Sequence, residues 1–201
     1  DEVETVLKCD QDWGNEKVKK GRVLVEFVSS NPTGPLHIGH ARGAVLGNII
    51  SNLLSNQGYE VTKEYYVNDA GRQINILALS IMLETFQNKI NKEGLYQGSY
   101  IKDLAKKFME AKLVDEINNP LDKFSDDPDE RIDQLISHYK KDSPKTWIQI
   151  RDFSVDEMIK LIKDDLSRMG ILHDEWFYES SLGSIEKKGS SVTKALDEVV
   201  K

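Results

Sequence analysis

The chain has 201 residues, of which 39% are hydrophobic and 30% are charged, a size and composition typical of one globular domain with an appended lobe. No apolar run approaches the roughly 20 residues of a membrane-spanning helix, so we expect no contact with a membrane. The net charge of -7 argues against a free-standing nucleic-acid binder, because phosphate binding depends on clustered lysine and arginine.

The chain begins with DEVETVLKCDQDW, which is acidic and lacks the basic start and apolar stretch of a signal peptide. Its single cysteine, Cys9, cannot form an internal disulfide, which fits a reducing compartment. We therefore expect a cytoplasmic protein.

Residues 21–90 alternate between strand-like and helix-like patterns. GRVLVEFVSS, from Gly21, predicts a buried strand, and the Pro/Gly-rich turn SSNPTGPLHIGH leads into the helical ARGAVLGNIISNLLSNQGY, which Gly58 ends. YEVTKEYYVND predicts a second strand, and AGRQINILALSIMLETFQNKI predicts a helix with Asn68 or Asp69 as its cap. This alternation favours a parallel α/β sheet with right-handed crossovers.

Residues 91–146 predict an inserted helical lobe. YIKDLAKKFMEAKLVDEI and DERIDQLISHYKK have charged amphipathic patterns and are joined by the polar NNPLDKFSDDP. The segment 147–201 then predicts a helix at SVDEMIKLIKDDLSRMGI, a strand at LHDEWFYES and a helix containing SSVTKALDEVVK. Only about half of a doubly wound sheet is accounted for.

The turn before the first long helix predicts a phosphate site. The first N–H groups of a helix lack partners and its dipole is positive there, so His37, Ile38, Gly39 and His40 would face an anion. Gly39 lets a flat ring such as adenine approach the backbone. His37 and His40 lie three apart on one helical face, where two imidazoles would flank a phosphoryl group and stabilise its developing charge.

Two other interpretations of these histidines remain. In an isolated HxxH pattern, histidines more often only cap or pad the start of a helix. A zinc site is the weaker alternative, because zinc-binding helices favour histidines four apart with a glutamate between them, and no third ligand is near. We expect no metal bound by the protein itself.

HIGH on a turn after the first strand of an α/β fold is the signature of class I aminoacyl-tRNA synthetases and related nucleotidyltransferases. Its context, EFVSSNPTGPLHIGHARGAVLGNIISNLLSNQGYEV followed by YYVNDAGRQI, closely resembles the arginyl-tRNA synthetases, strongly from Val23 to Ile76 and more weakly at WFYESSL. The resemblance implies the first half of a class I Rossmann-like (HUP-type) parallel sheet with an inserted helical lobe. It also implies that 1–20 are the tail of a tRNA-contacting N-terminal domain or a linker, and that 147–201 return to the catalytic fold and start a connective insertion.

The activity that the resemblance implies is that of an arginine-tRNA ligase. Such an enzyme activates L-arginine with Mg-ATP to arginyl-adenylate and pyrophosphate, and then transfers arginine to the 3′ end of tRNA-Arg. The family's second signature, KMSKS, and its anticodon-binding domain do not occur in this sequence. We therefore expect a fragment that is inactive alone, that meets tRNA mainly through other domains, and that is monomeric in the simplest case.

Two other functions compete with this one. A small adenylyltransferase would use the same HIGH turn, but the NPTGPLHIGHARGA context speaks against it. A non-catalytic tRNA- or partner-binding module would tolerate the missing second signature, although the acidic balance disfavours RNA binding. An NAD-binding protein is disfavoured because the first strand-to-helix turn lacks GxGxxG.

The resemblance also assigns residues. It implies His37 and His40 as catalytic residues, with Asn31 holding the α-amino group of arginine and Glu179 facing its guanidinium. The ATP-binding set is Thr33, Gly34, His37, Gly39 and His40. The arginine-binding set is Glu26, Ser29, Ser30, Asn31, His40 and Glu179.

The carboxylates have a physical reason to be in that pocket, since a planar, always charged guanidinium needs acceptors in a forked geometry. Glu26 lies inside the apolar VLVEFV, which favours a role in the site over an edge position facing solvent. A brace for the following loop is an alternative role. For Glu179 a surface position is as good an interpretation as the pocket.

Four further residues have two interpretations each. Asn68 and Asp69 would close over the substrates or cap the next helix, and we favour capping with a secondary role near the pocket. Trp147 and Trp176 would stack on bases or pack in the core, and we favour packing.

Overall fold

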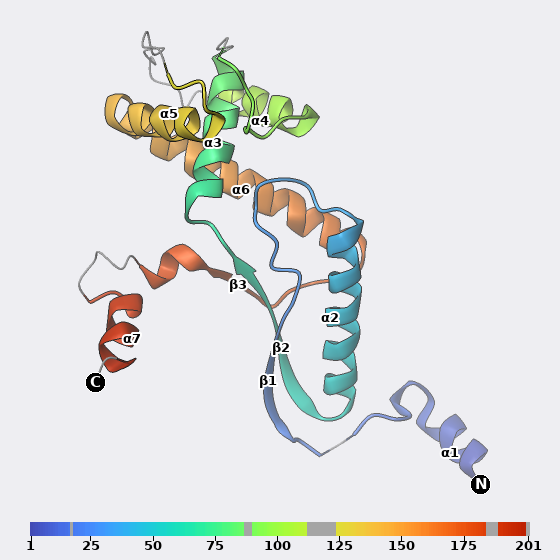
Figure 1. Cartoon of the computed structure of the whole chain (residues 1–201). Helices are drawn as coiled ribbons and strands as arrows, with labels where there is room; N and C mark the ends of the chain where they lie inside the picture. Colours follow the sequence, from blue (N-terminus) through green and yellow to red (C-terminus); the bar gives the residue numbers. More distant parts are fainter. Residues whose placement is uncertain (17, 87–89, 112–123, 184–188, 200–201) are drawn as a thin grey trace.

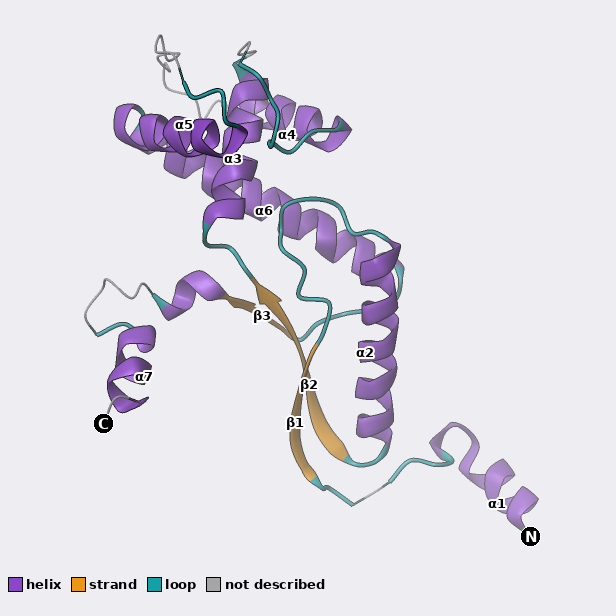
Figure 2. Cartoon of the chain, in the orientation of Figure 1, coloured by secondary structure: helices purple, strands orange, loops and turns teal. Residues whose placement is uncertain are grey.

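A computed structural model describes residues 1–16, 18–86, 90–111, 124–183 and 189–199. The elements follow one another as shown in Figures 1 and 2. They are α1 (Glu2–Cys9), η1 (Asp10–Asp12), β1 (Gly21–Glu26), α2 (Ile38–Asn56), β2 (Tyr59–Val67), α3 (Arg72–Thr85), α4 (Ser99–Glu110), α5 (Pro128–Asp142), α6 (Pro144–Arg168), β3 (Glu175–Tyr178), η2 (Glu179–Leu182) and α7 (Ser191–Val199).

The sheet is parallel, which confirms the predicted α/β fold. Its described strands lie in the order β1-β2-β3, with Glu26 opposite Glu64 and Glu64 opposite Glu175. Among the strands that the structure describes, β1 pairs only with β2, and Leu24 is 56% exposed. The prediction of a buried first strand was therefore wrong, because an apolar run is buried only where neighbours cover both faces.

Helix α2 packs against the sheet through small residues. Ala44, Gly47 and Ser51 are its buried positions and share one face of the helix. The absence of a side chain at Gly47 is required, because a Cβ there would lie 2.2 Å from the Phe27 ring. The helix ends before Gly58, whose φ of 86° fits the predicted glycine stop.

The helices α3 to α6 enclose a second core, which we call the helical core. α3 contributes Ile76 to Leu83, α4 contributes Ile101 to Phe108, and α5 contributes Ile132 to Tyr139. This core lies beyond the end of β2 and away from α7 (Figure 1). The predicted domain boundaries, 1–20, 21–90, 91–146 and 147–201, stay a prediction.

Helix α6 connects the helical core to the sheet. Its first half buries Trp147 and Ile150 in the helical core, and its second half buries Ile162 and Leu166 against the sheet. The helix predicted from Ser154 begins ten residues earlier, because Ser143 and Pro144 start it. None of the helices within the described ranges is long and apolar enough to cross a membrane.

Some predicted segments differ in extent or lie outside the described residues. α1 is an exposed helix in the segment expected to be a tail or linker. The end of the helix predicted at 100–117 lies outside the described residues from 112 onward, as do positions 184–188 and 200–201.

Candidate functional site

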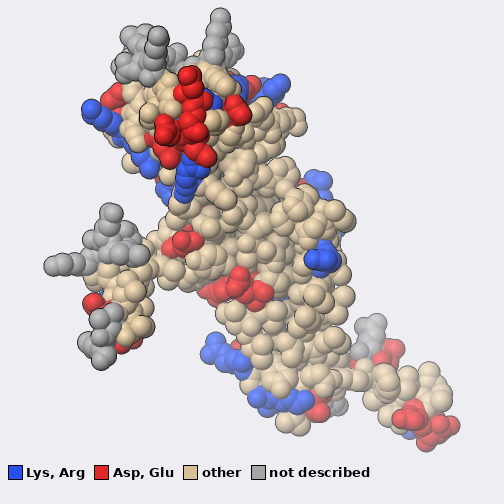
Figure 3. Space-filling model, viewed as in Figure 1, with Lys and Arg blue, Asp and Glu red and all other residues tan. Residues whose placement is uncertain are grey.

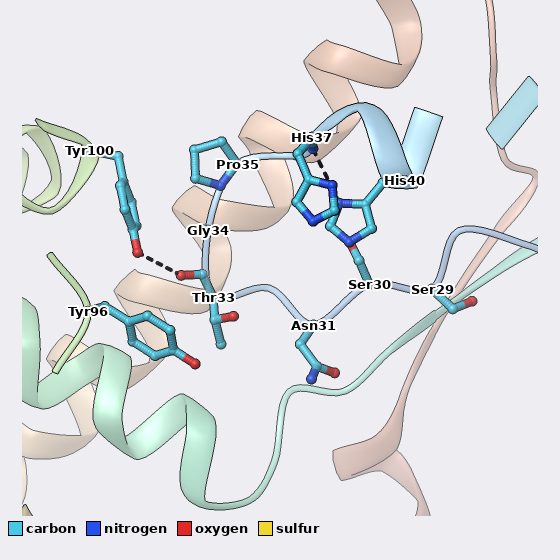
Figure 4. A pocket seen from close by; sticks show the side chains of 10 residues that line it. All are labelled: Ser29, Ser30, Asn31, Thr33, Gly34, Pro35, His37, His40, Tyr96 and Tyr100. Carbon is cyan, nitrogen blue, oxygen red and sulfur yellow. Dashed lines mark hydrogen bonds between the residues drawn. The ribbon is translucent and has the colours of Figure 1, made fainter. Parts of the chain in front are cut away.

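A cleft of about 520 Å³ opens where β1 ends and α2 begins. Most of its lining comes from the loop between these two elements, and the rest comes from the first turn of α2 and from the helical lobe (Figure 4). The lining residues are Ser29, Ser30, Asn31, Thr33, Gly34, Pro35, His37, His40, Tyr96 and Tyr100. Seven of these are residues that the sequence assigned to ATP or arginine.

His37 and His40 form a stacked pair at the first turn of α2. Their ring centroids are 3.8 Å apart and the planes are inclined by 23° (Figure 4). Nδ1 of His37 accepts the N–H of Gly39 at 3.1 Å, and Nδ1 of His40 accepts the N–H of His37 at 3.3 Å. Both histidines therefore cap the helix, as one of the two interpretations expected.

Capping also prepares the two rings to donate hydrogen bonds to a phosphoryl group. A neutral imidazole whose Nδ1 accepts a hydrogen bond carries its proton on Nε2, which is then a donor. Burial, followed by the nearby His37, lowers the pKa of His40, which favours the neutral form of this ring. The cap thus orients a neutral N–H donor beside the positive end of a helix.

Gly39 does not line the cleft, and the structure gives it another local role. A Cβ at this position would lie 3.0 Å from Cε1 of His37. Glycine therefore leaves room for the His37 ring to fold back over the helix start.

The loop after β1 is held in an unusual backbone conformation. Val28 and Ser29 have φ values of 69° and 41°, in the left-handed region that costs L-residues energy. Side-chain bonds offset this cost: the N–H of Tyr66 donates to Oγ of Ser29 at 3.1 Å, and the Ser30 and Tyr65 hydroxyls lie 2.8 Å apart. The second strand therefore fixes the position of the loop.

Two tyrosines of the lining were missed by the sequence analysis. Tyr96 precedes α4 and Tyr100 lies in its first turn, and both point toward the cleft from the helical lobe (Figure 4). The hydroxyl of Tyr100 donates to the Thr33 carbonyl at 3.1 Å. The local signal was the pattern YQGSY, with two aromatic residues around a glycine, but nothing in it points to a loop 67 residues away.

The predicted carboxylates do not line the cleft. Glu26 is exposed at the end of β1, and Glu179 is partly buried just after β3. Both carboxylates lie close enough to Tyr66 of β2 to affect its phenol. The pKa of Tyr66 is raised first by burial, then by the charge and hydrogen bonding of Glu179, and then by the charges of Asp69 and Glu26. The ends of the three strands thus form an acidic edge beside the cleft, and Figure 3 shows acidic side chains at the level of the sheet as well as on the lobe.

Asn68 and Asp69 do not cap α3, so the favoured interpretation was wrong. The N-cap of α3 is Gly71, which has no side chain to accept a hydrogen bond from the first turn of the helix. The Asp69 carboxylate instead accepts two hydrogen bonds from Ser180, one from its backbone N–H at 2.8 Å and one from its hydroxyl. In the amide orientation that satisfies its neighbours, the Asn68 side-chain nitrogen donates to the Glu179 carboxylate at 2.9 Å. These two residues tie the end of β2 to the end of β3.

The tryptophans pack in the structure, as favoured. Trp147 is 3% exposed in the helical core. Trp176 is stacked on Tyr65, with ring centroids 4.3 Å apart.

Residues 2–194 match the family "tRNA synthetases class I (R), catalytic domain". The chain is 40% identical to an arginine-tRNA ligase of Vesicomyosocius okutanii over 90% of its length, and 40% identical to one of Coxiella burnetii over the same share. In both cases it covers 33% of the relative. The chain therefore spans about a third of the length of the curated relatives it matches.

Solved structures agree with the fold. A Campylobacter jejuni protein assigned as an arginyl-tRNA synthetase superimposes with a TM-score of 0.71 and 33% identity, over 98% of this chain and 38% of that one. The arginyl-tRNA synthetase of Thermus thermophilus has the same fold, with a TM-score of 0.56, 21% identity and coverage of 97% and 29%. Sequence and fold together place this chain in the class I tRNA synthetase (R) catalytic domain family.

Proposed function

We propose that the polypeptide carrying this chain is an arginine-tRNA ligase, and that this chain supplies the part of its active site that holds the triphosphate and the amino group of arginine. The observation that carries the proposal is the stacked pair of His37 and His40, whose Nδ1 atoms are occupied by helix capping. Their Nε2–H groups are left as donors beside the start of α2. Family membership supports the same reading.

The first reaction step would join arginine to AMP. A carboxylate oxygen of arginine attacks the α-phosphorus of Mg-ATP, the bond to the bridging oxygen breaks, and pyrophosphate leaves with the electron pair. Mg²⁺ enters with the nucleotide as part of the substrate. Donors fixed before the reaction stabilise the charge on the five-coordinate phosphorus without a covalent enzyme intermediate, which is the role we assign to His37, His40 and the first turn of α2.

Within the cleft, we assign Thr33 and Gly34 to the nucleotide, together with Gly39 next to it. Ser29, Ser30 and Asn31 would hold the amino acid; the Asn31 amide donates to Gln73 at 2.6 Å and is thereby oriented. The side-chain oxygen of Asn31 would accept a hydrogen bond from the α-amino group of arginine.

The acidic edge is our candidate for guanidinium recognition. Glu26 lies at the end of β1 and Glu179 directly follows β3, and these two parallel strands flank β2, which carries Tyr66. A cation placed there would be attracted to both carboxylates, whereas a neutral side chain would leave their negative charges uncompensated. Arginine would then pass to the 3′ end of the tRNA, which would be bound largely by parts of the polypeptide outside this chain. We place this reaction in the cytoplasm.

Arginine-dependent exchange of pyrophosphate into ATP, with and without tRNA-Arg, tests this proposal on the full-length polypeptide. We expect exchange that His37→Ala and His40→Ala each reduce by about 10²-fold or more, as for other preorganised donors. A wild type that binds tRNA yet shows no exchange would instead identify a non-catalytic binding module.

A further inference from the structure

The helical lobe contributes directly to the wall of the cleft. Tyr96 and Tyr100 lie across the cleft from His37 and His40, with the segment Thr33 to Pro35 between the two pairs (Figure 4). The two tyrosines are therefore placed beside the segment that leads into the first turn of α2.

Each tyrosine is anchored to the helical core. The N–H of Tyr96 donates to Oγ of Ser80 on α3 at 3.0 Å, and the Ser80 hydroxyl donates onward to the carbonyl of Ile76 at 2.7 Å. Tyr100 follows Gly98 and Ser99 at the start of α4, whose apolar face packs in the helical core. The positions of both rings thus follow the packing of the helical core.

Tyr100 makes the link between lobe and loop. Its hydroxyl donates to the Thr33 carbonyl at 3.1 Å, and a Cβ added at Gly34 would lie 3.6 Å from the same hydroxyl oxygen. The N–H of Thr33 in turn donates to the Asn31 carbonyl at 2.8 Å. One phenol therefore restrains the segment between the residues assigned to the amino group and the histidines.

We propose that Tyr100 is a positioning residue for the nucleotide. Through its hydrogen bond to the Thr33 carbonyl it holds the segment before α2 in the position that places the triphosphate beside His37 and His40. The helical lobe then serves the adenylation step as a brace for the cleft. This inference rests on the proposed function and extends it to a residue that contacts the loop through its hydroxyl.

The test is Tyr100→Phe in the full-length polypeptide, because this change removes one oxygen and keeps the ring. Loss of a single neutral hydrogen bond corresponds to about a 3- to 10-fold change in an equilibrium. We expect the Kd for Mg-ATP, measured by calorimetry, and the KM for ATP in exchange to rise by that factor. The KM for arginine should stay within about twofold and the Tm within about 2 °C.

Tyr59→Phe is the matched control, since Tyr59 begins β2 at the opposite end of the strand from the cleft. It should leave all four quantities at wild-type values. A Tyr100→Phe protein with wild-type affinity for Mg-ATP, or one that loses Tm while its KM for ATP is unchanged, overturns the positioning role.

The two proposals fail differently. A wild type that binds Mg-ATP but shows no arginine-dependent exchange refutes the ligase, while the calorimetric comparison of Tyr100→Phe still decides the inference. A wild type that does not bind Mg-ATP refutes both.

Discussion

The rings of His37 and His40 stack 3.8 Å apart, and each ring accepts a backbone N–H through Nδ1. Protonation of Nδ1 on either ring would break a cap of α2, and protonation of both would place two positive charges in contact. The same contacts that build the helix start therefore leave Nε2 of each ring free of the cap.

This relationship predicts the titration of His40. Burial and then His37 lower its pKa, so its NMR titration should have a midpoint below 6.5. His37→Asn should raise the midpoint toward 6.5 without reaching it, because burial is the larger cause. The resonance of His173, which bonds to the Phe27 carbonyl instead, is the internal control and should not move. An unchanged His40 midpoint in the variant would show that the rings do not interact.

Two glycines of α2 should respond to alanine in opposite directions. A Cβ at Gly47 meets the Phe27 ring at 2.2 Å, whereas one at Gly43 meets nothing within 4 Å. Gly47→Ala should lower the free energy of unfolding by about 1–3 kcal/mol through overpacking. Gly43→Ala should raise it by about 0.5–1 kcal/mol through helix propensity. Urea titration of both variants measures the two changes in the free energy of unfolding. Equal changes in the two variants would contradict the packing described for this helix.

The bridge from Asp69 to Ser180 should be measurable as a coupling. Asp69 accepts both the N–H and the hydroxyl of Ser180, so Asp69→Ala should lower the free energy of unfolding by about 1–2 kcal/mol. A double-mutant cycle with Ser180→Ala should give a coupling of about 0.5–1 kcal/mol. Asp152→Ala, which removes only an exposed ion pair with Arg151, should cost less than about 0.5 kcal/mol. A zero coupling would mean that the bridge does not form in solution.

His173 should make the fold sensitive to acid. Burial lowers the pKa of this ring, which lies over Phe27 and beside Tyr65 and Trp176, and Lys63 adds to the effect while Asp174 and the Phe27 carbonyl oppose it. Its folded-state pKa lies below 6.5, so the unfolded chain takes up its proton first as pH falls. The contribution of neutral His173 to the free energy of unfolding is therefore complete above pH 6.5. It is lost as the pH falls from 6.5 through the folded-state pKa.

His173→Phe keeps an aromatic ring and removes the titration. The variant should therefore show a shallower fall in the free energy of unfolding between pH 6.5 and pH 5 than the wild type. Urea titrations across that range measure the slope, and identical slopes would assign the acid sensitivity to other groups.

The local part of the site was predictable from the sequence because its determinants are local. The strand, turn and helix around HIGH follow from adjacent residues. The cleft gathers both histidines with the predicted Ser29, Ser30, Asn31, Thr33 and Gly34. The start of α6 was also within reach, since Ser143 followed by Pro144 is a common helix beginning.

Features that depend on distant packing were not predictable. The choice of Asp69 between capping α3 and bonding Ser180 depends on where the chain returns 111 residues later. The same holds for Tyr100 and Thr33, and for the exposure of β1, which depends on which strands flank it. Propensity describes what a residue does with its neighbours in sequence, and these contacts are made elsewhere.

The pairing of β3 with β2 joins two strands that are far apart in sequence. β1 and β2 are joined by a single crossover, but Glu64 meets Glu175 only after the whole helical lobe has been traversed. Closing so large a loop is entropically costly until α3 to α6 have compacted the intervening chain. The pairing of β2 with β3 therefore depends on the compactness of the helical lobe that lies between them in sequence.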